Sequence, residues 1–62
     1  MAEQVEVHLR GAKSIWLSSE EGMRVEAAMR AREATITVQQ LNKGPVTTLN
    51  LANVTHVERF PN

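Results

Sequence analysis

Residues 18–33 read SSEEGMRVEAAMRARE, the one stretch of the sequence with helical periodicity. Ser18, followed three residues later by Glu21, is a capping box. In this motif the hydroxyl accepts from a first-turn amide and the carboxylate reaches back to the amide of the cap. Small and apolar residues recur at helical spacing, namely Gly22, Val25, Ala28 and Met29. This narrow stripe predicts a helix that packs closely on a sheet.

The segments on both sides of this helix alternate between apolar and polar residues, as strands with one buried face do. The alternation runs through residues 5–10, 14–17, 34–39, 46–51 and 55–60. Turn residues separate the segments at 11–13, 42–45 and 52–53. The sequence therefore predicts a single α+β domain over residues 1–62, in the order β-hairpin, helix, β-hairpin, short strand. We expect an antiparallel sheet of four to five strands with the helix packed on one face.

The register of the first hairpin decides which face of the sheet receives Trp16. If residues 11–13 form the loop, His8 pairs with Trp16 and the indole lies on the face away from the helix. If Gly11 and Ala12 alone form a type II′ turn, the side chains of the second strand exchange faces of the sheet and Trp16 joins the core. We favour the first register because it buries two branched aliphatic residues rather than one ring.

Size and charge limit the possible functions. The 62 residues contain seven basic and seven acidic side chains and no cysteine. A chain of this length buries only about 60% of its unfolded surface, so we expect self-association to supplement its stability. The N-terminal residues lack the features of a signal peptide, and no apolar run approaches the roughly 20 residues of a membrane span. We therefore expect a cytoplasmic protein with no membrane partner.

The residues that could carry chemistry are few. The sequence has two histidines, His8 and His56, the residue type that most often serves acid–base chemistry and metal binding in proteins. We expect His8 on the face away from the helix, and His56 joins it there if Thr55 and Val57 point inward. Two imidazoles on adjacent strands could hold a metal, but with no third ligand in view we expect no metal site and no cofactor. The serines lie near no histidine in the strand pattern, and the glutamates resemble ordinary surface charge. We therefore predict that the protein is not an enzyme.

Trp16 is the strongest candidate for a contact with a partner, because tryptophan is enriched among interface hot spots. On the face away from the helix we expect it beside His8, with Thr35, Thr37 and Thr48 around it. These five residues form the predicted partner-binding site. We therefore predict a non-catalytic binding or assembly module. The first expected partner is a second copy of the chain, and the next is a host protein.

The alternative function is nucleic-acid binding through basic side chains. The candidates are Arg10, Lys13, Arg30 and Arg32. The balanced net charge and the glutamates close to these residues favour an ordinary solvated surface instead. Sheets that bind single strands also offer several aromatic rings, whereas this sequence has one tryptophan and one phenylalanine. Nucleic acid is therefore the second choice.

The layout of the chain and one sequence phrase resemble a known group of proteins. A β-hairpin leads into Ser-x-Glu-Glu at the start of the helix, and the second hairpin ends in residues 49–58, LNLANVTHVE. In these features the chain resembles small uncharacterised proteins encoded in bacterial phages and prophages, with a hairpin-helix-hairpin layout. The resemblance implies a cytoplasmic location and a role in binding rather than turnover, and it carries over no site residue.

Overall fold

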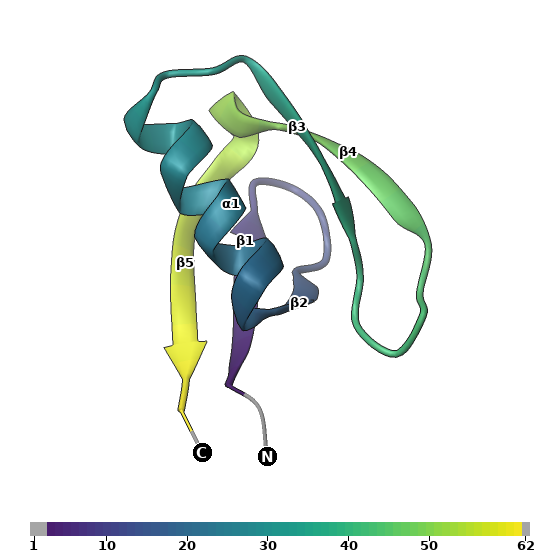
Figure 1. The fold of residues 1–62 in the computed structure, drawn as a ribbon. Helices are drawn as coiled ribbons and strands as arrows, with labels where there is room; N and C mark the ends of the chain where they lie inside the picture. Colours follow the sequence, from purple (N-terminus) through teal and green to yellow (C-terminus); the bar gives the residue numbers. More distant parts are fainter. Residues whose placement is uncertain (1–2, 62) are drawn as a thin grey trace.

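The computed structural model describes residues 3–61. The elements follow one another as β1 (Gln4–Leu9), β2 (Ile15–Ser18), α1 (Ser19–Arg30), β3 (Thr35–Gln39), β4 (Val46–Asn50), the short 3-10 helix η1 (Leu51–Asn53) and β5 (Val54–Phe60). Figure 1 shows α1 lying across β1 and β5. The order hairpin, helix, hairpin, last strand is the predicted one, so the α+β fold class is confirmed. Within the described residues, no helix combines the length and the apolar character needed to cross a membrane.

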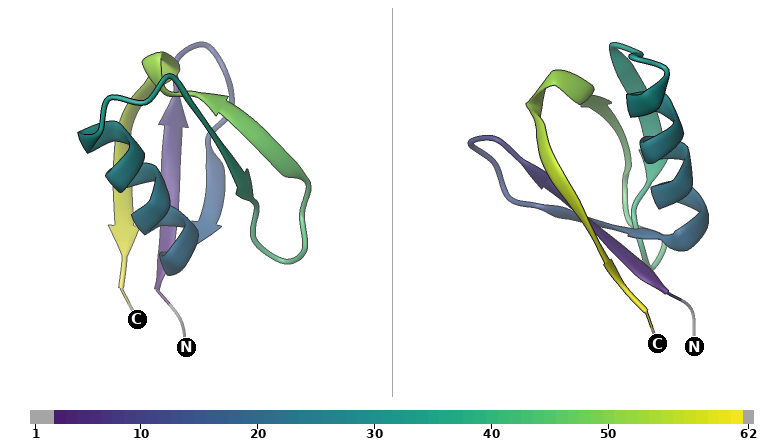
Figure 2. Two further views of the ribbon diagram at one scale, coloured as in Figure 1. Left: turned by 45° about the horizontal axis from the view of Figure 1, so that its top comes forward. Right: turned by 90° about the vertical axis from the view of Figure 1, so that its left-hand side faces the viewer.

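The five strands form two antiparallel sheets instead of the single sheet that was expected. Sheet A has the order β2-β1-β5, and sheet B is the hairpin β3-β4. Because β5 returns to lie beside β1, both edges of β1 are occupied by strands of sheet A. The second hairpin is a separate sheet that lies on the β2 side of sheet A (Figure 2). There the backbone N–H of Leu41 donates to the carbonyl of Trp16 at 3.0 Å, which ties the end of sheet B to the edge of β2.

The register of the first hairpin places Trp16 outside the core. The ladder pairs Val5 with Leu17, Glu6 with Trp16 and Val7 with Ile15. The predicted face of Trp16 is therefore correct, but the pairing is shifted by two residues, so that the indole stands across from Glu6 and not from His8. The shift leaves a connection of residues 10–14, in which Gly11 has a φ of 70°.

The core lies where α1 and sheet B meet the inner face of sheet A. Its buried side chains are Val5, Val7, Leu17, Val25, Ala28, Val38, Leu49 and Leu51. Three residues of the predicted helical stripe are buried, whereas Met29 is 37% exposed and lies outside the core. A Cβ atom on Gly22 would lie 2.6 Å from Cγ2 of Val5. The helix therefore approaches the sheet as closely as the small residues of the stripe predicted.

The first turn of α1 confirms half of the predicted capping box. Ser18 is the N-cap, and its hydroxyl accepts from the backbone N–H of Glu21 at 3.2 Å. The Glu21 carboxylate does not return to the cap: it accepts from the backbone N–H of Gln39 on β3 at 2.9 Å and from Arg24 at 2.8 Å. The hydrogen bond from Gln39 and the one from Arg24 hold the pKa of the Glu21 carboxyl below its usual value.

The helix ends at Arg30, three residues earlier than the sequence pattern indicated. Arg32 adopts a left-handed conformation with a φ of 58°. The amides of Arg32 and Glu33 donate to the carbonyls of Met29 and Ala28, at 3.1 and 3.0 Å. This is a Schellman motif, which satisfies the last carbonyls of the helix and turns the chain toward β3.

Candidate functional site

The face of sheet A that points away from α1 carries the candidate site, and we call it the open face. Its residues come from alternate positions of three strands: Glu6 and His8 from β1, Trp16 from β2, and His56, Glu58 and Phe60 from β5. They alternate with residues that face the helix and the core. The open face has two chemically different ends, an aromatic one and a polar one.

Trp16 and Phe60 form the aromatic end. Their ring centroids lie 5.2 Å apart with the planes tilted by 42°. The two residues belong to the two edge strands of sheet A, so their side chains reach toward each other across β1. The indole is 37% exposed and the phenyl ring 42% exposed. Phe60 was not predicted as a site residue, because the pairing of β5 with β1 leaves no local signal in the sequence.

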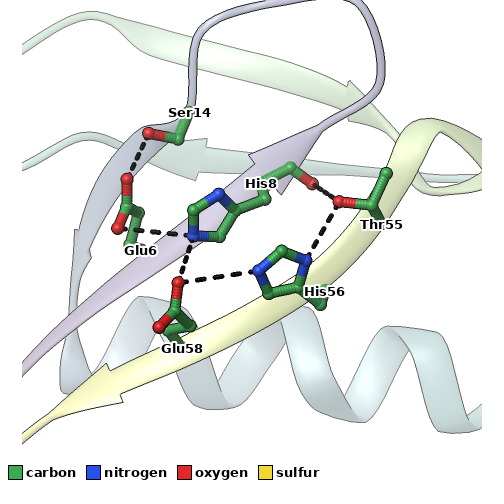
Figure 3. Close-up of polar contacts among 6 residues, drawn as sticks. All are labelled: Glu6, His8, Ser14, Thr55, His56 and Glu58. Atoms are coloured by element: carbon green, nitrogen blue, oxygen red, sulfur yellow. Dashed lines mark hydrogen bonds and ion pairs between the residues drawn. The ribbon is translucent and has the colours of Figure 1, made fainter.

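Glu6, His8, His56 and Glu58 form the polar end, which we call the His/Glu cluster. The two imidazole rings stack with centroids 4.0 Å apart and planes 12° from parallel. Nε2 of His8 lies 2.6 Å from Oε1 of Glu58 and 3.3 Å from Oε1 of Glu6. Nε2 of His56 lies 3.5 Å from Oε1 of Glu58 (Figure 3). The cluster thus spans two neighbouring strands.

The expectation that no third ligand accompanies the histidines is wrong. His8, His56 and Glu58 each present one ligand atom, and the three atoms lie within 4.8 Å of one another. In the sequence, His56 is expected to join His8, whereas Glu58 resembles ordinary surface charge. Glu58 lies two residues after His56, the spacing that puts both side chains on one face of a strand. This spacing was the available signal.

Two hydroxyl residues hold the His/Glu cluster in place. Ser14 Oγ donates to Oε2 of Glu6. Thr55 is the extra residue of a β-bulge, because the ladder passes from the pair His8–His56 to the pair Leu9–Val54. Its hydroxyl donates to the carbonyl of His8 and lies 3.2 Å from Nδ1 of His56 (Figure 3).

The predicted threonines do not surround Trp16. Thr35 and Thr37 lie on β3 and Thr48 on β4, in sheet B, whereas Trp16 belongs to sheet A. Thr37 and Thr48 are cross-strand partners, and their hydroxyls share a hydrogen bond of 2.9 Å. The division of the strands into two sheets separates these residues from the open face. Of the predicted partner-binding residues, Trp16 and His8 remain on it.

The basic residues of the alternative function do not form one surface. Arg10 and Lys13 lie in the connection between β1 and β2, whereas Arg30 ends α1 and Arg32 follows it. The right-hand view of Figure 2 shows this connection and the end of the helix on opposite sides of the molecule. All four side chains are exposed. Their separation does not favour a shared contact with one nucleic-acid backbone.

No family model, curated protein or solved structure matches this chain. The resemblance to phage proteins therefore stays a prediction from the sequence.

Proposed function

We propose that this protein is a non-catalytic assembly module that binds a second copy of itself through the aromatic end of the open face. The contact between Trp16 and Phe60 carries the proposal. Two large rings, 37% and 42% exposed, adjoin each other on a sheet face that no other described element covers. Large aromatic side chains of this kind dominate the binding energy of protein interfaces.

A second copy is the partner that the composition of the core favours. The buried side chains of the described residues are all aliphatic, from alanine to leucine, and neither aromatic residue contributes to this core. Small domains with so modest a core commonly gain stability by association. A copy of the chain brings the same ring pair, so a two-fold axis through the aromatic end would stack four rings at the centre of the contact.

This arrangement also suits the charges on the open face. With the axis at the aromatic end, the two His/Glu clusters lie at opposite outer ends of the contact, where water solvates them. A standard interface buries about 800 Å² per partner, about a fifth of the 4315 Å² surface of this chain. The two rings expose only part of such an area, so we expect a weak dimer whose population depends on concentration.

Light scattering coupled to size exclusion, over a range of protein concentrations, tests the proposal. We expect a concentration-dependent dimer for the wild type and a folded monomer for Trp16→Ala and for Phe60→Ala. Met23→Ala is the matched control, because Met23 is 57% exposed but lies on the helix. A wild-type monomer at millimolar concentration, or a dimer that survives Trp16→Ala, would overturn self-assembly through this face.

Fluorescence gives a second measurement, since Trp16 is the only tryptophan of the chain. Burial between two copies shields the indole from a soluble quencher. We therefore expect iodide quenching to decrease as the protein concentration rises through the dimerisation range. Quenching that stays constant while light scattering reports a dimer would place the contact elsewhere and contradict the proposal.

A further inference from the structure

We infer that the His/Glu cluster binds a divalent transition-metal ion, with Zn²⁺ as the best fit, through His8, His56 and Glu58. The inference does not depend on self-assembly, because the cluster and the aromatic end use different residues of the open face. One ring nitrogen of each histidine and a carboxylate oxygen of Glu58 lie within 4.8 Å of one another, and Nε2 of each ring lies within 3.5 Å of Oε1 of Glu58. Imidazole nitrogen and carboxylate oxygen are ligands that Zn²⁺ takes in proteins.

The distances within the cluster are close to those of a tetrahedral zinc site. With metal–ligand bonds of about 2.0–2.2 Å, neighbouring ligand atoms lie about 3.3 Å apart. The separation from His56 Nε2 to Glu58 Oε1 is 3.5 Å, and that from His8 Nε2 to Glu6 Oε1 is 3.3 Å. The 2.6 Å approach of His8 to Glu58 has to lengthen by less than 1 Å.

Thr55 prepares His56 for coordination through Nε2. The single hydroxyl proton of Thr55 is donated to the carbonyl of His8, which can only accept. The oxygen of Thr55 therefore accepts from Nδ1–H of His56, 3.2 Å away. In a neutral imidazole this leaves the lone pair on Nε2. That lone pair faces the carboxylate of Glu58, so two acceptors point at each other and a cation between them satisfies both.

His8 presents a second unsatisfied nitrogen to the same place. Its Nε2 is buried and has no hydrogen-bond partner among the described residues, although carboxylate oxygens of Glu58 and Glu6 lie 2.6 and 3.3 Å away. A buried polar atom without a partner costs about 1–3 kcal/mol. Coordination of a metal ion would satisfy this atom.

The cross-strand pairing of the cluster points to the same conclusion. Glu6 lies directly opposite Glu58, and His8 lies directly opposite His56. Like charges at directly opposed positions destabilise a sheet. A divalent cation between the two carboxylates would remove that repulsion. Ser14 holds Oε2 of Glu6 and leaves Oε1 on the side of His8, which makes Glu6 the nearest group for a fourth ligand position.

The test is a Zn²⁺ titration in competition with a chromogenic chelator, on the full chain purified without a polyhistidine tag. We expect one ion per chain, and a loss of affinity of about 100-fold or more for each of His8→Gln, His56→Gln and Glu58→Gln. Thr55→Val, which removes only the hydroxyl behind His56, should cost about tenfold. Glu20→Gln, at an exposed helix position, is the control that should bind like the wild type.

Long-range ¹H–¹⁵N spectra of the two imidazoles supply a readout that affinity alone does not. We expect Zn²⁺ to shift Nε2 of both rings while Nδ1 of His56 keeps its proton, and we expect Mg²⁺, which prefers oxygen ligands, to leave both rings unchanged. Trp16→Ala should bind Zn²⁺ like the wild type, which separates this site from self-assembly. Three results would each overturn the inference: no competition with the chelator, binding that survives in both histidine variants, or one ion per two chains.

Discussion

Replacing Gly22 with alanine is expected to destabilise the fold, although alanine is the better helix former. A Cβ atom at this position would lie 2.6 Å from Cγ2 and 2.8 Å from Cβ of Val5. Optimal contacts between carbon atoms are about 3.5–4.0 Å, so the overlap is about 1 Å. Val5 is fully buried in the core, and rotation of its side chain cannot move its Cβ. The clash can be relieved only if α1 moves away from β1.

Two opposing effects set the size of the change. Alanine is favoured over glycine within a helix by about 1 kcal/mol. Overpacking of a buried contact costs about 1–3 kcal/mol, and a clash that no rotation relieves belongs at the upper end of that range. The net expectation for Gly22→Ala is a loss of about 1–2 kcal/mol, out of a total stability of roughly 3–9 kcal/mol for a chain of this length.

Urea unfolding followed by circular dichroism measures this loss, and thermal unfolding should show a midpoint lower by about 5–15 °C. Ala27→Gly is the control, because Ala27 is exposed on the same helix and reports helix propensity without the clash. It should cost about 1 kcal/mol. A Gly22→Ala protein as stable as the wild type would refute the close approach of α1 to β1.

Two further changes test the turn of sheet B and the contact between α1 and β3. Asn42 and Lys43 both have positive φ, 58° and 57°, as a type I′ turn requires, and glycine is favoured at the second of these positions. Lys43→Gly should therefore raise the free energy of unfolding by about 0.5–1 kcal/mol in a urea titration, and a loss of stability would contradict the assigned turn. The folded protein lowers the pKa of the Glu21 carboxyl from its ordinary value of 4.5. The carboxylate therefore stabilises the fold at pH values above 4.5, and this stability is lost as the pH falls through the lower pKa of the folded protein. Unfolding measured from pH 7 to pH 3 should show Glu21→Gln less stable than the wild type at pH 7, with the difference shrinking on acidification, whereas a constant difference would exclude this role of the charge.

The parts of the fold that depend on neighbouring residues could be predicted from the sequence. The helix start at Ser18 follows from a cap whose partner is three residues away. The favoured register of the first hairpin was wrong by two residues, and a shift of two keeps each side chain on the same face, so the predicted outward direction of Trp16 was still correct. The turn predicted at Ala52 and Asn53 corresponds to the 3-10 helix η1 between β4 and β5.

The parts that depend on distant residues could not be predicted. The Glu21 carboxylate looks like half of a capping box in the sequence, but it finds the amide of Gln39, eighteen residues away. The two ends of the open face also arise from the pairing of β1 with β5, which no local pattern reveals. That pairing brings Phe60 to Trp16 and Glu58 to His8, and it excludes sheet B from sheet A.

The pairing of β1 with β5 determines when, during synthesis of the chain, the two proposed binding activities can appear. A ribosome delivers β1 before β5, so the central strand keeps one unpaired edge until β5 has been synthesised. Each end of the open face needs side chains from β5. A nascent chain that lacks this strand can neither dimerise nor capture an ion in the proposed manner, and both abilities would emerge together when β5 docks.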